Sequence, residues 1–520
     1  MNSLTTFENT KSKIGFVVGP IIFVTILLMP VPETFLQSVG QIPNLTEIEI
    51  LELATGMKTV LALLLLMITW WITEAIPISV TAMLPMVMIP LFQVKGLVNG
   101  ALFDFTFANT VKNYAHPVIG LFFGCFLLAA AMQKYGIDKR ATLWILTRGK
   151  IAANPNRILL AMMYSSAFMS MWISNTATVA ILLPIAMGLI VHSKLQDSKN
   201  GFGVALMLGI AWSASVGGVG TIIGTPPNGI AISILKQNNL DAINFLDWMK
   251  IGVPYVVLFI PILWFLLIKL FPASSDTIID IKFLSSQQSQ IGKLKTGEIL
   301  TASVFLLAIL LWISRPFWDI LLTNNIAVKV SWIDEYLIGL FVGLILFVIP
   351  VNFKKLEFVL NWKDTKFVDW GTLILFGGGL ALSDAMFKTG LASWIAASFI
   401  GLFGSPSTFV MLMIVVVFIV FLTEVTSNTA VTAMMVPVLI AIALKTGNDP
   451  TTLAVAVAFS ASLAFMLPVA TPPNALVFGT GYVKMTQMVK AGFFLNIIAC
   501  FFTLIIFFIF GHLIFKILTF

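Results

Sequence analysis

Charged residues are scarce in this sequence. Only 10% of its 520 residues are Asp, Glu, Lys or Arg, whereas soluble domains average about 25%. Cysteine and histidine are rarer still, with two and three copies, so neither a disulfide framework nor a zinc cluster is indicated. The formal net charge is +7, but no block of consecutive Lys or Arg provides a basic face for nucleic acid. These absences exclude a soluble globule and a nucleic-acid-binding protein.

Apolar residues fill the chain instead. They make up 59% of it, and a mean hydropathy of +1.00 extends over the whole length, which indicates an all-α polytopic membrane protein. The polar start leads into the first apolar run without a small-residue cleavage site, so we expect a retained span and no signal peptide. Eleven apolar runs are candidate transmembrane helices: 14–31, 57–75, 78–93, 116–133, 202–235, 251–271, 298–314, 336–352, 370–387, 452–480 and 491–515.

Two further apolar stretches are interrupted by polar residues. Segment 158–192 is broken at Ser174-Asn175-Thr176, and segment 406–444 at Ser427-Asn428-Thr429. Each arm has about 15 residues and reaches about 23 Å, less than the roughly 30 Å of a hydrocarbon core. We therefore expect two re-entrant helical hairpins.

The basic residues indicate an orientation. With the N-terminus in the cytoplasm, eleven passes and two hairpins place 20 of the 30 Lys and Arg residues inside, as the positive-inside rule requires. The C-terminus then lies outside. Residues 138–150 alternate basic and apolar side chains at helical spacing, which predicts a helix lying flat on the cytoplasmic surface.

Both polar interruptions belong to an internal repeat. Each half carries a Ser-Asn-Thr triplet and then a Thr-Pro-Pro-Asn segment, in the same order, with the triplets 253 residues apart and the second motifs, 225–228 and 471–474, 246 apart. If the first hairpin opens inward and the second outward, as the pass count demands, the repeats are inverted. Inverted repeats with broken segments at matching places indicate a secondary transporter whose site lies at the midplane.

The two motifs have complementary chemistry. A Ser-Asn-Thr triplet at the start of a buried arm presents amide and hydroxyl donors at a positive helix end, which suits an anion. In Thr-Pro-Pro-Asn neither proline donates an N–H, so the helix is broken and carbonyls such as those of Gly224 and Ala470 are free for a hard cation such as Na⁺.

Charge balance favours cation coupling. No Lys or Arg lies within 158–193 or 389–444, so an anion at the hairpin tips would be held by dipoles, hydroxyls and amides. Import of a dianion against 100 mV, negative inside, costs about 4.6 kcal/mol. If each dianion entered together with more than two Na⁺, net positive charge would enter the cell and the membrane potential would favour import.

Five motifs together resemble a known family. They are Trp71–Pro77 (WITEAIP), Ser170–Thr176 (SMWISNT), Gly224–Asn228 (GTPPN), Thr423–Thr429 (TEVTSNT) and Ala470–Asn474 (ATPPN). The combination, which extends from about residue 14 to 517, is similar to the divalent anion/sodium symporters, the INDY-type di- and tricarboxylate carriers. The resemblance implies an elevator-type homodimer with a scaffold domain (14–150, containing four spans and the surface arm helix, and 272–405) and a transport domain (151–271 and 406–520).

The resemblance also assigns site residues. The first sodium site would use Ser170, Ser174, Asn175 and Gly224, and the second Thr423, Thr426, Asn428 and Ala470. Substrate carboxylates would meet Asn175, Thr176, Thr225, Asn428, Thr429, Thr471 and Pro472. Thr225 stands where some relatives carry Ser and Thr426 where some carry Ala, and some family members exchange dicarboxylates without sodium.

We therefore expect a Na⁺-coupled importer of C4 dicarboxylates such as succinate, malate and fumarate, with at least two Na⁺ sites, in a bacterial inner membrane. A citrate symporter, a sulfate symporter and a Na⁺-independent dicarboxylate exchanger are the alternatives. An intramembrane enzyme needs a nucleophile paired with a histidine or two facing carboxylates, and His116, His192 and His512 are in no such setting. A passive anion channel would not need carbonyl-lined cation sites.

Overall fold

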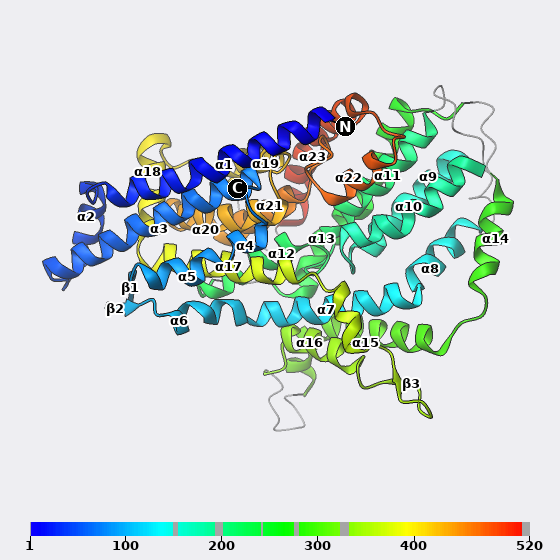
Figure 1. Cartoon of the computed structure of the whole chain (residues 1–520), viewed down its shortest axis with the longest axis horizontal. Coiled ribbons are helices and arrows are strands. Elements are labelled where there is room, and N and C mark those ends of the chain that lie inside the picture. Colours follow the sequence, from blue (N-terminus) through cyan, green and yellow to red (C-terminus); the bar gives the residue numbers. More distant parts are fainter. Residues whose placement is uncertain are drawn as a thin grey trace.

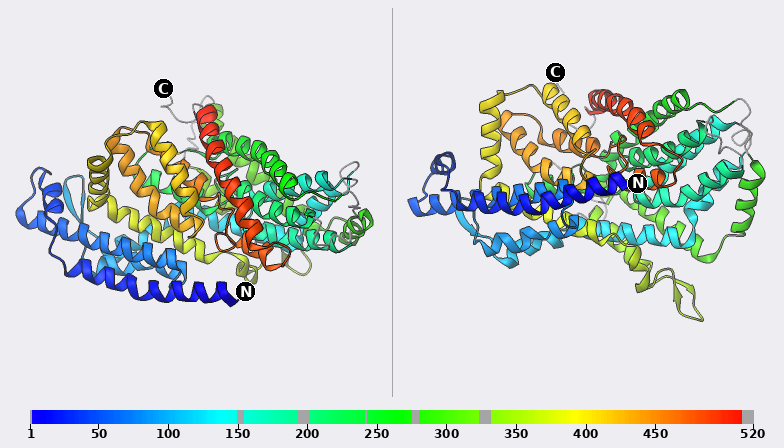
Figure 2. Two further views of the ribbon diagram at one scale, coloured as in Figure 1. Left: turned by 90° about the horizontal axis from the view of Figure 1, so that it is seen from above. Right: turned by 45° about the horizontal axis from the view of Figure 1, so that its top comes forward.

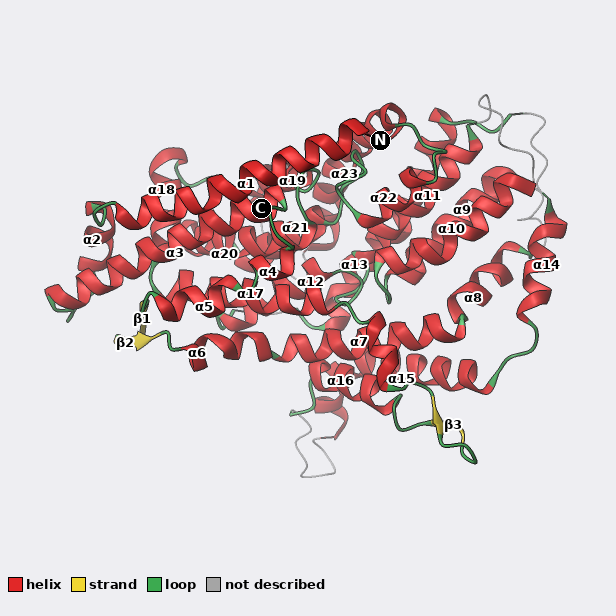
Figure 3. Cartoon of the chain, in the orientation of Figure 1, coloured by secondary structure: helices red, strands yellow, loops and turns green. Residues whose placement is uncertain are grey.

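The fold is almost entirely helical (Figures 1 and 3). A computed structural model describes residues 2–148, 154–192, 201–240, 243–274, 280–322 and 332–511. Within them, nine helices are long and apolar enough to cross a membrane, which confirms a multi-pass membrane protein. These nine include seven of the eleven expected spans and one arm of each expected hairpin. The other four spans, 78–93, 202–235, 336–352 and 452–480, consist of shorter helices.

The described residues of the first half of the chain contain sixteen elements. They are α1 (Asn2–Leu28), α2 (Glu33–Gly40), α3 (Glu47–Thr73), α4 (Ile78–Thr81), α5 (Leu84–Leu91), β1 (Lys95–Val98), β2 (Ala101–Asp104), α6 (Phe107–Val111), η1 (Lys112–Ala115), α7 (Pro117–Tyr135), α8 (Ile137–Leu146), α9 (Pro155–Ser170), α10 (Asn175–His192), α11 (Phe202–Gly218), α12 (Pro226–Gln237) and α13 (Phe245–Leu270).

The second half follows a similar order. It contains α14 (Ile281–Ile291), α15 (Thr296–Leu322), α16 (Glu335–Ile345), β3 (Pro350–Asn352), β4 (Glu357–Phe358), η3 (Trp362–Phe367), α17 (Trp370–Lys388), α18 (Leu391–Phe403), α19 (Thr408–Leu422), α20 (Asn428–Thr446), α21 (Pro450–Ala461), α22 (Pro472–Gly479) and α23 (Met485–Phe510).

The repeat is longer than its two motifs. From α3 to α13 the chain forms a long helix, a short helical region, a two-stranded antiparallel hairpin, a long helix, a short helix, a helical hairpin, a broken helix and a final long helix. From α15 to α23 it forms the same series, with β3–β4 in the place of β1–β2. The sequence did not predict the two β-hairpins, α2 or α18, because each is short and flanks a stronger apolar run.

The expected helical hairpins and broken helices are present. Hairpin α9–α10 turns at 171–174 and hairpin α19–α20 at 423–427. Each broken helix restarts at a threonine in extended conformation, Thr225 (φ −147°, ψ 145°) and Thr471 (φ −144°, ψ 147°), followed by two prolines at the first helical positions. Proline is tolerated there because the first helical N–H groups have no partner within the helix.

The two halves interlock at the broken helices. Helix α12 of the first half packs against α20 and α21 of the second, and α11 packs against α22. The crossing is buried, with Trp212 on α11 inclined to Phe465 beyond α21 at 5.8 Å between ring centroids. The left view of Figure 2 shows α1 along one edge of the molecule.

A second contact holds the outer helices. Helix α7 packs closely on α16, where Gly124 lies against the backbone of Gly339 and Gly343. A Cβ on Gly124 would lie 2.0 Å from the carbonyl oxygen of Gly339, so only glycine permits this approach. The helix predicted at 138–150 is present as α8, which buries one face containing Thr142 and Leu146 against its neighbours; its position on the cytoplasmic surface stays a prediction. Residues 149–150 of that prediction and the C-terminal segment 512–520 lie outside the described residues.

Candidate functional site

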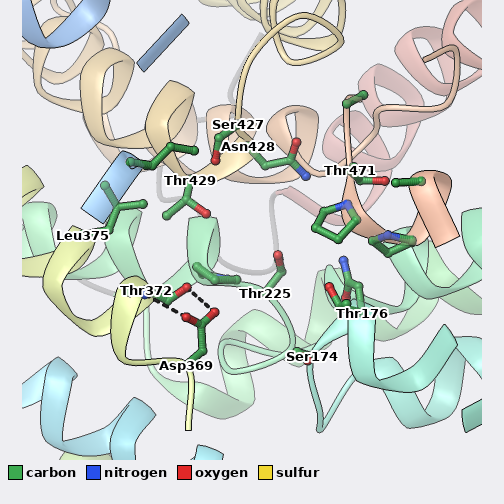
Figure 4. Close-up of a pocket in the computed structure, with 18 of the residues that line it drawn as sticks. Ser174, Thr176, Thr225, Asp369, Thr372, Leu375, Ser427, Asn428, Thr429 and Thr471 are labelled. Carbon is green, nitrogen blue, oxygen red and sulfur yellow. Dashed lines mark hydrogen bonds between the residues drawn. The ribbon is translucent and has the colours of Figure 1, made fainter. Parts of the chain in front are cut away.

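Both hairpin turns and both helix breaks line one cavity of about 730 Å³ (Figure 4). Among the helices that begin at it are α10, α12, α20 and α22. The first turns of α10 and α20 carry N–H groups without partners in the helix, whereas α12 and α22 begin with two prolines and contribute only the positive end of the helix dipole. These four ends create an environment that favours an anion.

Most of the predicted site residues line this cavity. Ten do so: Ser174, Asn175, Thr176, Gly224, Thr225, Asn428, Thr429, Ala470, Thr471 and Pro472. Every residue assigned to the substrate is among them. Ser170, Thr423 and Thr426, which the resemblance assigns to sodium, are not lining residues.

The hydroxyls of Ser170 and Thr423 form hydrogen bonds to the two site asparagines, Asn175 and Asn428. The Ser170 hydroxyl donates to Asn175 Oδ1 at 2.5 Å, and the Thr423 hydroxyl donates to Asn428 Oδ1 at 2.7 Å. Both hydroxyls are buried, and Thr423 also reaches the carbonyl of Ala461 at 2.8 Å. The repeat therefore places a hydroxyl five residues before each asparagine and bonds it to the same atom, which fixes the asparagine side chain.

The helix breaks are held by one asparagine each. Asn228 Nδ2 donates to the carbonyls of Gly218 and Thr221, ten and seven residues earlier. Asn474 Nδ2 donates to the carbonyls of Ala464 and Leu467, with the same two spacings. These bonds close each broken segment into a loop, so the fourth residue of Thr-Pro-Pro-Asn is structural in both halves.

Oxygen atoms converge where the first break meets the first hairpin turn. A Cβ on Gly224 would lie 2.5 Å from the carbonyl oxygen of Gly218 and 3.0 Å from that of Ser170. A Cβ on Gly218 would lie 2.7 Å from Asn175 Oδ1. Backbone and amide oxygens brought together around residues without side chains form the kind of site that hard cations prefer.

The second half departs from this symmetry at two residues. The Thr426 hydroxyl donates to the carbonyl of Trp71 at 3.3 Å, away from the cavity, so this residue would reach a cation only through its backbone. Glu424, whose counterpart in the first half is Met171, is buried and accepts hydrogen bonds from the backbone N–H groups of residues 465–467 and from Asn496. Its carboxylate ties the turn of α19–α20 to the break between α21 and α22.

The opposite wall of the cavity was not predicted. It consists of Glu74 after α3, Ser79 in α4, and Asp369, Thr372 and Leu375 at the start of α17. The Asp369 carboxylate accepts from the backbone N–H of Thr372 at 3.0 Å and from its hydroxyl at 2.6 Å. An Asp three residues before a Thr at the start of an apolar run is a capping signal, but sequence alone could not show that this cap faces a cavity.

Comparisons with known proteins show the family of the chain. The family model described as the sodium:sulfate symporter transmembrane region matches residues 14–517. The sodium-dependent dicarboxylate transporter SdcS of Staphylococcus saprophyticus is 35% identical over 517 residues, covering 94% of this chain and 90% of the relative. SdcS of Staphylococcus aureus strain bovine RF122 / ET3-1 is 34% identical over 524 residues, covering 95% and 92%.

A solved structure shares the fold. The YdaH transporter of Alcanivorax borkumensis, whose crystal structure has an unusual topology, superimposes with a TM-score of 0.55 at 11% sequence identity, covering 85% of this chain and 97% of the other. At this identity the likeness concerns the fold alone.

Proposed function

The chain belongs to the sodium:sulfate symporter family, and from this premise we propose that it imports C4 dicarboxylates such as succinate, malate and fumarate together with Na⁺. Its curated relatives are named sodium-dependent dicarboxylate transporters. The chain is thus a member of a transporter family and not of an enzyme family.

The observation that carries the proposal is the pair of triplets facing one cavity. Asn175 and Thr176 line it from the start of α10, and Asn428 and Thr429 line it from the start of α20. Figure 4 shows Thr176, Asn428 and Thr429 around the cavity. A dicarboxylate has two anionic ends, and each end would meet one amide, one hydroxyl and one helix N-terminus. Thr225, Thr471 and Pro472 would complete the contacts from the two helix breaks.

Sodium ions would be cargo held directly behind the triplets. The first Na⁺ would be bound by the carbonyl of Gly224 together with Ser170, Ser174 and Asn175. The second would use Thr423, Asn428, Ala470 and the backbone of Thr426. Each asparagine would then contact both a carboxylate and a cation, so occupation of the cation site would favour binding of the anion. This shared contact is a physical basis for coupling.

The proposed motion is an elevator. Both hairpins and both broken helices would move as a transport domain (151–271 and 406–520) past a scaffold (14–150 and 272–405), in a homodimer in a bacterial inner membrane with a cytoplasmic N-terminus. The interlocking of α12 with α21 supports joint movement of the two halves of the site.

Uptake of radiolabelled succinate into proteoliposomes tests the function. We expect uptake in a Na⁺ gradient and none when choline replaces Na⁺. Asn175→Ala and Asn428→Ala should each reduce uptake at least tenfold with an unchanged gel-filtration profile. Asn238→Ala, at the far end of α12 and outside the cavity, is the control and should transport normally.

The alternatives give different results in the same assay. Equal uptake in Na⁺ and choline, with acceleration by succinate inside the vesicles, would identify an exchanger and refute sodium coupling. If citrate or sulfate inhibited succinate uptake more strongly than malate does, the substrate would be a tricarboxylate or sulfate and not a C4 dicarboxylate. Near-normal uptake by either asparagine variant would refute the site.

A further inference from the structure

Two carboxylates line the anion-binding cavity from the end of α3 and the start of α17, outside the hairpins and the helix breaks. Among the lining residues, all of which are described, Glu74 and Asp369 are the acidic side chains, and no Lys or Arg is present. Both acids are exposed within the structure. Lys11, which donates to the carbonyl of Val425 behind the α19–α20 turn, does not line the cavity. The cavity proposed to bind an anion therefore contains two acidic side chains, whose formal charge has the same sign as that of the substrate.

The direction of the Asp369 carboxylate is fixed. Its two bonds from Thr372 hold it at the first turn of α17, and Figure 4 shows this pair on the side of the cavity facing Ser427, Asn428 and Thr429. The carboxylate caps α17, so the positive end of this helix is neutralised by its own side chain. The N-terminal ends of α10, α12, α20 and α22 at the cavity belong to the hairpins and breaks, so these elements contribute the positive helix ends and the acidic side chains come from elsewhere.

A carboxylate that projects into the cavity comes within reach of the acidic side chains. A cavity of about 730 Å³ would be roughly 11 Å across as a sphere, so a group near its centre lies about 6 Å from the wall, less than the Debye length of about 8 Å at physiological ionic strength. A substrate with two carboxylates can direct both to the hairpin turns. A third carboxylate on the same carbon chain has no such place and projects towards Asp369 and Glu74.

We propose that Asp369 limits the charge of the accepted anion to two, so that the site selects dicarboxylates over tricarboxylates by repulsion from the Asp369 carboxylate. The selection rests on the proposed function and adds to it the residues that determine the substrate class. Asp369 does not contact a dicarboxylate held at the turns, so it acts on the third carboxylate alone.

A matched pair of ligands isolates the third charge. Glutarate and tricarballylate share one five-carbon chain and differ by a carboxylate on the central carbon. Titration calorimetry on the purified full-length protein in detergent, at pH 8 and constant ionic strength with saturating NaCl, gives the ratio of their Kd values. Asp369→Asn keeps the cap of α17 because Asn also accepts from the N–H of Thr372. We expect this variant to lower the ratio of the tricarballylate Kd to the glutarate Kd roughly three- to tenfold, with glutarate binding nearly unchanged.

Asp449→Asn is the matched control. Asp449 caps α21, accepts from the N–H of Thr452 at 2.8 Å and from its hydroxyl at 2.5 Å, and lies outside the cavity. This control should leave the ratio unchanged, and Glu74→Gln should lower it less than Asp369→Asn does. An unchanged ratio in Asp369→Asn would overturn the proposal, as would a ratio lowered by Leu375→Ala alone, which would show exclusion by size. Absence of Na⁺-dependent glutarate and succinate binding in the unmodified protein would instead refute the proposed function, and the proposal with it.

Discussion

Glu424 offers a direct test of how the second helix break is held. Its carboxylate is 3% exposed and accepts from four donors. Oε1 lies 2.7 Å from the N–H nitrogen of Phe465, 3.0 Å from that of Met466 and 2.7 Å from Asn496 Nδ2. Oε2 lies 3.1 Å from the backbone nitrogens of Met466 and Leu467. Successive N–H groups converge on one buried charge, as donors do around a bound anion.

The change Glu424→Gln keeps the size of the side chain and removes one acceptor. If the amide oxygen takes the place of Oε1, the new NH₂ group faces the N–H of Leu467, and that donor is left unpaired. A hydrogen bond to a charged acceptor contributes about 1.5–3 kcal/mol, and an unpaired buried donor costs about 1–3 kcal/mol. Removal of a buried charge offsets part of this loss. We expect a net destabilisation of about 2–4 kcal/mol, concentrated in the segment between α21 and α22.

Two measurements test whether Glu424→Gln destabilises this segment. The midpoint of heat-induced loss of the monodisperse gel-filtration peak in detergent should fall. The Na⁺ concentration for half-maximal succinate uptake should rise several-fold, because Ala470 and Thr471 lie in the loosened segment. Glu357→Gln on β4, where the carboxylate is exposed, is the control. Unchanged values for both measurements in Glu424→Gln would refute the view that this carboxylate organises the break.

Three further predictions concern other residues. Gly224→Ala should abolish uptake because its Cβ would lie 2.5 Å from the carbonyl oxygen of Gly218. Ala470→Gly, at the matching position of the second half, is the control and should retain uptake. Normal uptake by Gly224→Ala would contradict the close packing of residue 224 against Gly218. Gly124→Ala should lower the thermal midpoint because its Cβ would lie 2.0 Å from a backbone oxygen, whereas Gly120→Ala, 3.6 Å from a leucine methyl group, should not; equal midpoints would contradict the helix packing. Burial raises the pKa of Asp138 in α8 to about 6, so the free energy of unfolding falls by roughly 3 kcal/mol as the pH rises from about 4 to 6. Asp138→Asn should remove this pH dependence and stabilise the protein at neutral pH. A thermal midpoint of this variant below that of the unmodified protein at pH 7.5 would contradict the prediction.

The sequence predicts the two halves of the site because local chemistry determines them. A polar triplet inside an apolar run and a proline pair inside another each end a helix wherever they occur, and their repetition at nearly equal spacing indicates that they meet. All seven residues assigned to the substrate line one cavity. The roles of these residues stay predictions until uptake and binding are measured.

The opposite wall could not be predicted in the same way. Asp369 and Glu74 end or begin ordinary helices, and their local sequence is explained by capping and turn formation alone. Their place in the cavity depends on how α3, α4 and α17 pack against the hairpins, which is a long-range property. Likewise, hydropathy measures apolar length and does not detect short helices inside a run, so it did not show that the runs 78–93 and 336–352 contain only short helices. The breaks in 202–235 and 452–480, by contrast, were predicted from their proline pairs.

The first and second hairpin turns differ in how they are attached, and the difference bears on the mechanism. In the first half, the hydroxyl of Thr221 donates to the carbonyl of Met171 within the same bundle. In the second half, the Val425–Thr426 turn is bonded to helices outside its hairpin, through Lys11 at 3.2 Å and through the carbonyl of Trp71 at 3.3 Å. Both bonds are long, and exposed or neutral bonds of this kind contribute only about 1 kcal/mol each. If the hairpins move past α1 and α3, these bonds must break, and their small contribution makes them a contact that can open during each cycle.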